Sequence, residues 1–465
     1  MQGSIAYADE KQLDSVRIED INIEELFYKK HLNTDYKPIK LEASLTEPID
    51  LSIQDIIAKA VENNLNLKIA KQNTRAAKWK FWNKFGDLLP DLNFNLNKQN
   101  RDGTFYLNSN FQSPIDETIA SAGMRLNYRA FNGGASTFLT MSEKYFREAT
   151  NFKELSQYNL TLLDSVTFYL ELLKAQASLS SNLKSLERAQ ANYELVQKFL
   201  KAGNGTKFEL LQADAQRARA QQELINQEAN FRNAEINLSE HLNIALSSAL
   251  HINSDQVKKV TLIDETIPVK EFLKTSFKEN PDIQAALRNK RAIAKQSLST
   301  YSSFLPTIDL YFDLSGTGAE WSDLFSVATL GFDANYTIGE GLGVNAVSRT
   351  LESKANLKRA ELEYLQEMQR IEKALRVAYL NFQRAKSILE ASHKEYIAAK
   401  EAYRLSQLRY KNGLEILTNL IQREEDLSES QLNLINATTD YNLSQVRMAF
   451  DMGIINSKDI VDSGI

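Results

Sequence analysis

The sequence predicts a mainly α-helical fold in which a unit of two β-strands followed by a hairpin of long helices occurs twice. The first observation is that the 465 residues include only 7 prolines and 17 glycines, so helix breakers are few. The second is that residues 115–267 and 307–465 contain no proline at all, which permits very long helices. The third is that the two halves of the chain can be aligned with each other.

Two long helices are expected, at about 135–202 and 344–411. At ~1.5 Å per residue the first would be roughly 100 Å long, far beyond the length of a globular helix. Apolar and small residues recur at alternating steps of four and three, from Phe168 to Leu200 in the first helix and from Met368 to Tyr410 in the second. This spacing is typical of coiled-coil packing.

Each long helix is expected to fold back at a glycine-containing tip into an antiparallel hairpin. The returning helices are expected at about 207–243 and 415–452. The tip residues are Gly203, Asn204, Gly205, Asn412 and Gly413.

Before each long helix the periodicity changes from helical to alternating. Strands are expected at about 91–99, 122–131, 307–314 and 329–338, each with one apolar and one polar face. The segments between strand partners, 98–121 and 315–329, are polar and contain glycine. They are expected to be exposed loops.

The duplication sets the domain organisation, because an internal repeat fixes the architecture of a chain. Laying Pro90 on Pro306 gives an offset of 306 − 90 = 216 residues, and the same offset pairs Asn64 with Asn280. Laying Gly203 on Gly413 gives 413 − 203 = 210. The expected repeats are 51–250 and 251–454, preceded by a signal remnant and extended arm (1–50) and followed by a tail (455–465). The residues expected at the joints between strands and helices are Pro90, Pro306, Gly133, Gly134, Gly339 and Gly341.

Composition excludes several classes of protein. The net charge of −5 and the lack of a basic block argue against nucleic acid as a partner. The absence of cysteine excludes disulfides, thiol catalysis and a lipid-attachment cysteine. Mean hydropathy is −0.39, and there is no apolar run of ~18 residues that would make a transmembrane helix. Any part that spans a membrane would therefore have to be built of β-strands.

The apolar faces of the strands have no obvious partner within the chain. A closed barrel in a bilayer needs none, because its apolar face contacts lipid, and two strands per repeat would require several subunits for closure. The expected lipid-facing residues are Leu92, Phe94, Leu126, Tyr128, Ile308, Leu310, Phe332 and Tyr336. Aromatic residues near the strand ends fit an interfacial girdle, although those of the Trp79–Phe85 group fit helix packing equally well.

No catalytic or cofactor-binding constellation is found, so the chain is not expected to be an enzyme. The run Gly339-x-Gly341-x-Gly343 lacks the third glycine of a dinucleotide-binding loop, since residue 344 is Val344. The four histidines are scattered without the spacing of a metal site or a Ser-His-Asp arrangement.

The order of these elements resembles the TolC-type outer-membrane efflux protein family. The order is helix, Leu-Pro, two strands, Phe131-Asn132-Gly133-Gly134, long helix, glycine tip and returning helix, and the resemblance covers roughly residues 51–454. It implies a homotrimer in which four strands per chain close a barrel in the outer membrane of a Gram-negative-type envelope. The helices would continue the barrel as a coiled-coil tunnel through the periplasm.

The resemblance also implies a function and partners. Family members are passive exit ducts of tripartite efflux or type I secretion systems, without a cofactor. A periplasmic adaptor (membrane fusion) protein recruits them, expected here at the helix tips, and an inner-membrane pump supplies the energy. Small toxic compounds or secreted polypeptides pass through such ducts.

A periplasmic gate is the site that the resemblance places at the tips. Glu209 matches a family carboxylate, and Tyr410 keeps the family's linking tyrosine. Glu415 stands where a basic residue is expected, while Asn419 and Gln422 replace positions that are commonly acidic. Glu209 and Glu415 could also be merely solvated tip residues.

Two alternatives remain open at the level of sequence. A soluble coiled-coil scaffold would explain the helices but not the paired strands, and it would not require detergent. A periplasmic adaptor protein would also have long helical hairpins, but only one hairpin, inserted between lipoyl-like β-segments.

Overall fold

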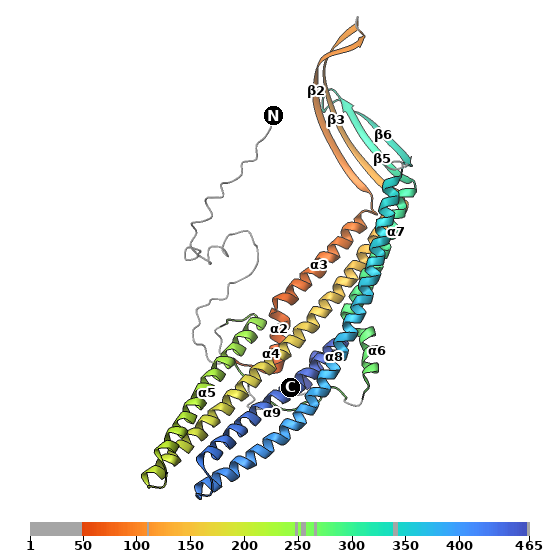
Figure 1. Ribbon diagram of the computed structural model, residues 1–465. Helices are drawn as coiled ribbons and strands as arrows, with labels where there is room; N and C mark the ends of the chain where they lie inside the picture. Colours follow the sequence, from red (N-terminus) through yellow and green to blue (C-terminus); the bar gives the residue numbers. More distant parts are fainter. Residues whose placement is uncertain are drawn as a thin grey trace.

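The computed structural model describes residues 49–108, 111–246, 250–252, 257–264, 267–337 and 343–462. Figure 1 shows an elongated molecule with a β-sheet at one end and the tips of two helical hairpins at the other. The predicted N-terminal arm, except for its last two residues, lies outside the described residues. So do the last three residues of the predicted tail.

Two copies of one element order make up the chain. The first copy is α2 (Ile53–Asn63), α3 (Leu65–Gly86), β2 (Asp91–Asn108), β3 (Phe111–Asn132), α4 (Ala135–Lys201) and α5 (Lys207–Leu242). The second is α6 (Val269–Glu279), α7 (Pro281–Ser299), the 3-10 helix η3 (Thr300–Phe304), β5 (Thr307–Gly318), β6 (Phe325–Asn335), α8 (Val344–Lys411) and α9 (Leu417–Met452). The short α10 (Ser457–Asp462) follows. Within the described ranges, no helix combines the length and apolar character needed to cross a membrane.

The long helices agree closely with the predicted ranges. Helix α4 begins at Ala135 and ends one residue before the predicted end, and α8 spans the predicted 344–411. Their lengths of 67 and 68 residues correspond to about 100 Å each.

The predicted coiled-coil seam of α8 is confirmed by burial. Every second-repeat seam residue is buried or half-buried, and the fully enclosed ones face α9 and its neighbours, where Leu420, Leu427 and Tyr441 are also buried. Enclosing a large apolar side chain contributes about 1.5–3 kcal/mol, so the seam is a major source of hairpin stability. The buried seam residues of α8 are Ile371, Leu375, Ala378, Phe382, Ala385, Leu389, Ser392, Tyr403, Ser406 and Tyr410.

The largest apolar core lies in the first repeat, midway along α4. There Ile56 of α2, Leu162 and Val166 of α4 and Leu238 of α5 are fully buried together. Beside them, β1 (Ile49–Asp50) pairs in parallel with β4 (Leu250–His251). This core holds the start of the first repeat against the connection into the second.

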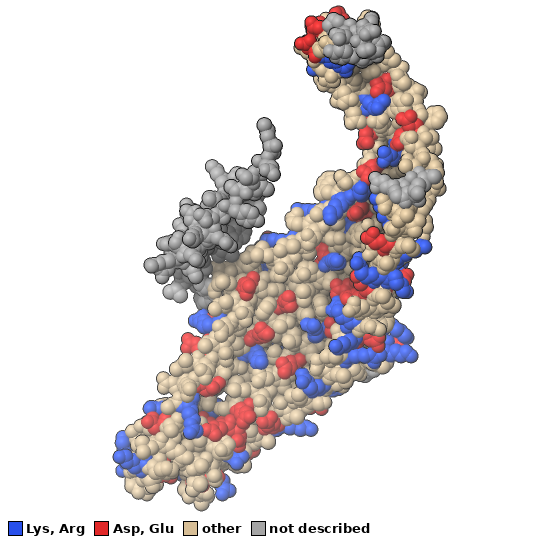
Figure 2. All heavy atoms as spheres, turned by 45° about the horizontal axis from the view of Figure 1, so that its top comes forward, with Lys and Arg blue, Asp and Glu red and all other residues tan. Residues whose placement is uncertain are grey.

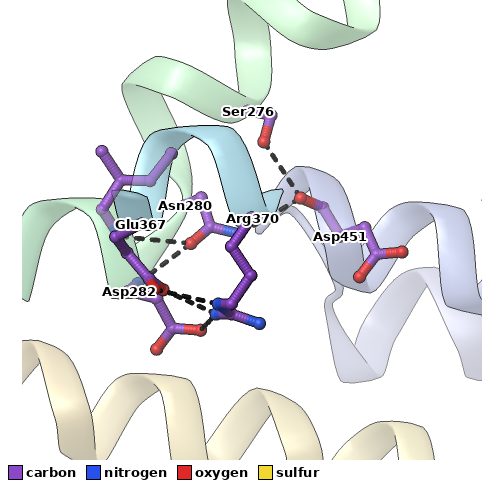
Figure 3. A network of polar contacts seen from close by, with 7 residues as sticks. Ser276, Asn280, Asp282, Glu367, Arg370 and Asp451 are labelled. Atoms are coloured by element: carbon purple, nitrogen blue, oxygen red, sulfur yellow. Dashed lines mark hydrogen bonds and ion pairs between the residues drawn. The ribbon is translucent and has the colours of Figure 1, made fainter. Parts of the chain in front are cut away.

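The two repeats share an equivalent hydrogen bond. Asn280 caps α7, and its side-chain amide donates to the carbonyl oxygen of Asp451 at 3.1 Å (Figure 3). Asn64 caps α3, and its amide donates to the carbonyl oxygen of His241 at 3.3 Å. Asn280 lies 216 residues after Asn64, and Asp451 lies 210 residues after His241. The same hydrogen bond therefore occurs in both repeats, and its two partners are shifted by the two offsets, 216 and 210 residues, that the alignment gave.

A polar network joins the remaining elements around this contact. The hydroxyl of Ser276 on α6 also donates to the Asp451 carbonyl, at 3.0 Å. Arg370 of α8 pairs with Asp282 of α7 at 3.1 Å and with Glu367 of its own helix at 2.6 Å. In Figure 3 the Arg370 guanidinium lies beside Asp282, and the Ser276 side chain points to the backbone of Asp451. Helices α6, α7, α8 and α9 are thus tied together at one level.

The four long strands form a single antiparallel sheet in the order β2-β3-β5-β6. Leu92 lies opposite Leu126, Leu126 opposite Phe312, and Phe312 opposite Leu330. Because directly opposed residues point to the same side of a sheet, the apolar residues of all four strands share one face. A register shift between Arg129 and Phe131 places Phe131 on that face as well.

The predicted loops 98–121 and 315–329 are wrong in most of their length. Strand β2 continues to Asn108 and β3 begins at Phe111, while β5 continues to Gly318 and β6 begins at Phe325. Polar residues stabilise the extension across the strands: Arg101 pairs with Glu117 at 3.5 Å. Backbone pairing continues where polar side chains pair across strands, although the apolar alternation has ended. Figure 1 shows β2 and β3 extending well past β5 and β6.

Candidate functional site

The two helix tips share one backbone geometry. In the first, the backbone N–H of Asn204 donates to the carbonyl of Phe199 at 2.9 Å, and in the second that of Leu414 donates to Arg409 at 2.9 Å. Gly203 and Gly413 adopt φ values of +80° and +70°, a conformation that other residues rarely adopt. These glycines therefore allow each long helix to turn back.

Glu209 caps the helix that follows the first tip. Its carboxylate accepts the backbone N–H of Thr206 at 2.8 Å and the Thr206 hydroxyl at 3.0 Å, and its own N–H donates to that hydroxyl at 3.2 Å. This reciprocal arrangement is a capping box, which satisfies N–H groups that a helix start leaves free. The sequence signal was present as Thr-x-x-Glu, and it gives Glu209 a structural task whether or not it faces a pore.

The second tip is held by different contacts. Glu415 pairs with Arg409 of α8 at 3.4 Å and accepts a hydrogen bond from Asn419 at 3.1 Å. Gln422 donates to Asp426 one turn further along α9 at 3.1 Å. The basic side chain expected at position 415 is thus replaced by that of Arg409, which precedes the tip. Glu415, Asn419 and Gln422 all bond within their own hairpin.

Tyr410 lies between the hairpins. It is buried, its ring centroid is 5.8 Å from that of Phe199, and it belongs to an apolar cluster with Leu417 and Leu420. Burial, together with the nearby Glu209 carboxylate, raises the pKa of Tyr410 to about 12. Of the predicted gate residues, the structure therefore brings Tyr410 and Glu209 near each other across the hairpins.

Sequence reasoning missed a row of polar contacts above the tips, here named the polar seam. It joins α4 of one hairpin to α9 of the other. Ser181 donates to Gln431 at 3.1 Å, the Ser185 and Ser428 hydroxyl oxygens are 2.9 Å apart, and Asn192 donates to Glu424 at 3.0 Å. The signal was available, because Ser181, Ser185, Arg188 and Asn192 recur at steps of four, three and four, which is the spacing of one helix face.

The sheet has one exposed apolar face. Phe94 and Phe332 are 70% and 69% exposed, and the other predicted lipid-facing residues are exposed too, except half-buried Ile308. On the opposite face, Arg125 pairs with Asp313 and Arg129 with Asp309, both at 2.9 Å. In Figure 2 most of the visible surface of the sheet carries neither charge, whereas both signs are scattered over the helices.

The junction of sheet and helices contains the predicted joint residues. Pro90 and Pro306 directly precede β2 and β5, and Gly133 and Gly134 lie between β3 and α4. At Gly133, with φ +65°, a Cβ atom would lie 2.7 Å from the Cα of Ser302, so the backbone segments approach too closely for a side chain. Gly339 and Gly341 lie outside the described residues. Trp79 at this level is 67% exposed and Trp82 is also exposed, which argues against packing inside the chain for these two rings.

Among the residues that the structure describes, no group of three or more acidic or histidine side chains could hold a metal ion. His241 is buried and lies 2.9 Å from the Ser165 hydroxyl oxygen, whereas His31 falls outside the described ranges. The structure thus combines a sheet with one exposed apolar face, a long helical extension and two helix tips that are held by different contacts.

Comparisons with known proteins agree with this geometry. The model of the family described as outer membrane efflux protein matches residues 56–243 and 273–453, one segment in each repeat. The outer membrane protein TolC of Vibrio cholerae is 23% identical over 436 residues, which cover 88% of this chain and 92% of that protein. Toxin and drug export protein A of Aggregatibacter actinomycetemcomitans is 24% identical over 307 residues, 64% of each. The CmeC outer membrane channel of Campylobacter jejuni has a TM-score of 0.77 at 16% identity, covering 94% of this chain and 97% of that one.

Proposed function

The chain belongs to the outer membrane efflux protein family, and from this premise we propose that three copies of it close into one duct. The chain is a subunit of an outer-membrane exit duct with a periplasmic extension, and it is not an enzyme. In the proposed trimer, the four-stranded sheets form the barrel and the helical hairpins form the tunnel wall.

The exposed apolar face of the sheet is the observation that carries the proposal. In water, a face with Phe94 and Phe332 about 70% exposed would be an unusually large apolar patch. In a bilayer the same face contacts lipid, while the ion pairs of Arg125 and Arg129 face the interior. Three sheets of four strands give 3 × 4 = 12 strands, within the range of about 8 to 26 for outer-membrane barrels.

The proposed partners follow from the two ends of the molecule. Outer-membrane lipid surrounds the barrel, and the exposed rings of Trp79 and Trp82 lie where an interfacial girdle is expected. A periplasmic adaptor contacts the tips at Gly203–Gly205 and at Asn412 and Gly413. An inner-membrane pump supplies the energy, as the resemblance to the exit ducts of this family implies. Small toxic compounds and secreted polypeptides are both cargoes that such a duct could carry.

The proposed gate lies at the tips. Tyr410 links the hairpins through its contact with Phe199 and its proximity to Glu209. Glu415, Asn419 and Gln422 hold the second tip through bonds within its own hairpin. The two tips would therefore separate by loss of the Tyr410 contact.

Conductance in planar lipid bilayers tests this function. The full-length protein, purified in detergent, is expected to insert and give discrete current steps, because a trimeric barrel provides one continuous aqueous path. Protein that stays in solution without detergent and gives no steps would favour the soluble scaffold instead.

A further inference from the structure

A buried cluster of polar groups lies where the hairpins of one subunit meet above the tips. Its members are Arg188 and Asn192 of α4, Tyr403 of α8 and Glu424 of α9. Glu424 is only 1% exposed. One of its carboxylate oxygens accepts the Asn192 amide at 3.0 Å, and the other lies 3.7 Å from Nε of Arg188. A single carboxylate thus links α9 to two side chains of the other hairpin.

This cluster has more buried polar atoms than hydrogen bonds. Within the described part of the chain, Nε of Arg188, Oε1 of Glu424 and the hydroxyl of Tyr403 have no hydrogen-bond partner. The same holds for the Ser406 hydroxyl, one turn further along α8, and for Oε1 of Gln216 on α5. Polar groups buried without partners destabilise a packed interface, and an ionised carboxylate does so most.

We propose that this cluster is a proton-sensitive lock between the two hairpins of a subunit, packed when Glu424 is protonated and loosened when Glu424 is ionised. The lock deepens the proposed function, since it rests on the hairpins being the wall of the duct. It stands above the tip contacts of Tyr410 and is independent of them.

The direction of the pH effect follows from where Glu424 binds its proton more tightly. Burial raises the pKa of Glu424 to about 7 from its ordinary 4.5, even though Arg188 and Asn192 act to lower it. When the hairpins separate, water reaches the carboxylate and the ordinary pKa returns. The packed state therefore binds the proton more tightly. It gains stability as pH falls from about 7 towards 4.5 and loses that stability as pH rises back to about 7, above which Glu424 is ionised in both states.

Titratable groups lie around Glu424 on all four long helices. Arg188 approaches from α4 and Tyr403 from α8, where burial and the Glu424 charge raise the pKa of the Tyr403 hydroxyl, so it stays neutral. On α9 itself, Glu425 adds a like charge that favours the protonated form. Arg219 of α5 forms an ion pair with Glu425 at 3.7 Å.

A route for water reaches the cluster from outside. A groove of about 540 Å³ between α4, α5 and α9 is lined by Glu424 together with Arg219, Glu223, Glu425 and Glu429. Figure 2 shows acidic side chains gathered toward the tip end of the helices on the visible face. Separation of α4 from α9 would widen this groove, so that its water reaches the buried carboxylate oxygens of Glu424 and hydrates the ionised form.

Distance measurement between spin labels tests the lock, because the chain contains no cysteine and labels can be placed without background. Lys201→Cys and Lys411→Cys place one exposed label on each tip. The labelled full-length chain is mixed with excess unlabelled chain and reconstituted in lipid, so that most assemblies contain one labelled copy. We expect a single short distance at pH 5.5 and an added longer one at pH 8.5, with the ratio of the two populations changing about tenfold or more, since one pKa unit corresponds to a factor of ten.

Substitutions assign the effect to Glu424. Glu424→Gln mimics the protonated side chain and should keep the short distance at both pH values. Glu390→Gln makes the same chemical change at an exposed position of α8 that does not line the groove, and it should behave as the wild type. Arg188→Gln removes the neighbouring positive charge and should move the transition to higher pH.

Distances that do not respond to pH in the wild type, or a wild-type response that survives in Glu424→Gln, would overturn the lock. So would a transition that stays in place in Arg188→Gln. The proposed duct fails by a different result: labels that respond to pH in a protein that passes no current would keep the lock and refute the duct.

Discussion

The imidazole of His241 is buried where α5 packs on α4, with Nε2 at hydrogen-bond distance from the Ser165 hydroxyl. The ring of Phe168 lies 5.1 Å away, centroid to centroid. Burial lowers the pKa of His241 to about 4 from its ordinary 6.5. The side chain is therefore neutral in the folded protein across most of the physiological range.

This burial predicts a pH-dependent stability. Between pH 6.5 and 4 only the unfolded chain takes up the proton, so the stabilisation is complete above pH 6.5 and decreases as pH falls. Between pH 7.5 and 5.0 the loss should be about 2 kcal/mol, at 1.36 kcal/mol per pKa unit. Thermal unfolding at these two pH values should show a larger drop for the wild type than for His241→Gln. Equal drops would contradict the assignment to His241.

Individual site residues were predictable only in part. The tip glycines and the Thr-x-x-Glu signal before α5 follow from local chemistry, because turns and caps depend on neighbouring residues. The placement of Glu424 against Arg188 depends on how one hairpin packs on the other, 236 residues apart in sequence (424 − 188). Helical periodicity alone reveals that a face is polar but not what covers it.

The accuracy of the predicted element boundaries depends on the length of the periodic pattern in each element. The helices came within two residues of their predicted ends, since their patterns extend over many turns and end at glycine tips. Strands β2, β3 and β5 were predicted too short. In β2 the alternation of apolar and polar residues stops at Leu96, while pairing between Arg101 and Glu117 continues the ladder. The fourth strand was predicted at 329–338 but spans Phe325–Asn335, so Tyr336 lies just past its end. The alternation of apolar and polar residues therefore indicates which part of the sheet has an apolar face, but it does not indicate where the strands end.

The apolar face of the sheet predicts how substitutions in β3 act. Leu126→Asp places a charge on that face and should impair insertion into lipid, at a cost of about 2 kcal/mol near the midplane. Asn127→Asp changes the next residue on the opposite, polar face and serves as the matched control. The fraction of protein that resists extraction from membranes measures the effect. Equal insertion of both variants would contradict the outward assignment of Leu126.

At the scale of the whole molecule, the duplication gives both repeats the same order of elements, but the two copies differ in detail. Asn64 and Asn280 make the same contact, each from the start of one helix to the last turn of another. The tips do not match, because Thr206 and Glu209 form a capping box on α5 while Ile416 gives α9 no side-chain cap. The polar seam adds a second asymmetry, since it joins the first helix of one hairpin to the second helix of the other.

Electron cryo-microscopy of the full-length chain in lipid nanodiscs would show the assembly of the duct. We expect three copies around one axis and a closed barrel of 12 strands (3 × 4), in which β6 of each copy pairs with β2 of the next. Leu126 and Phe332 should face lipid, and Arg125 and Arg129 the interior. A monomer in the bilayer, an open sheet, or a barrel with its apolar residues inside would refute the trimeric duct.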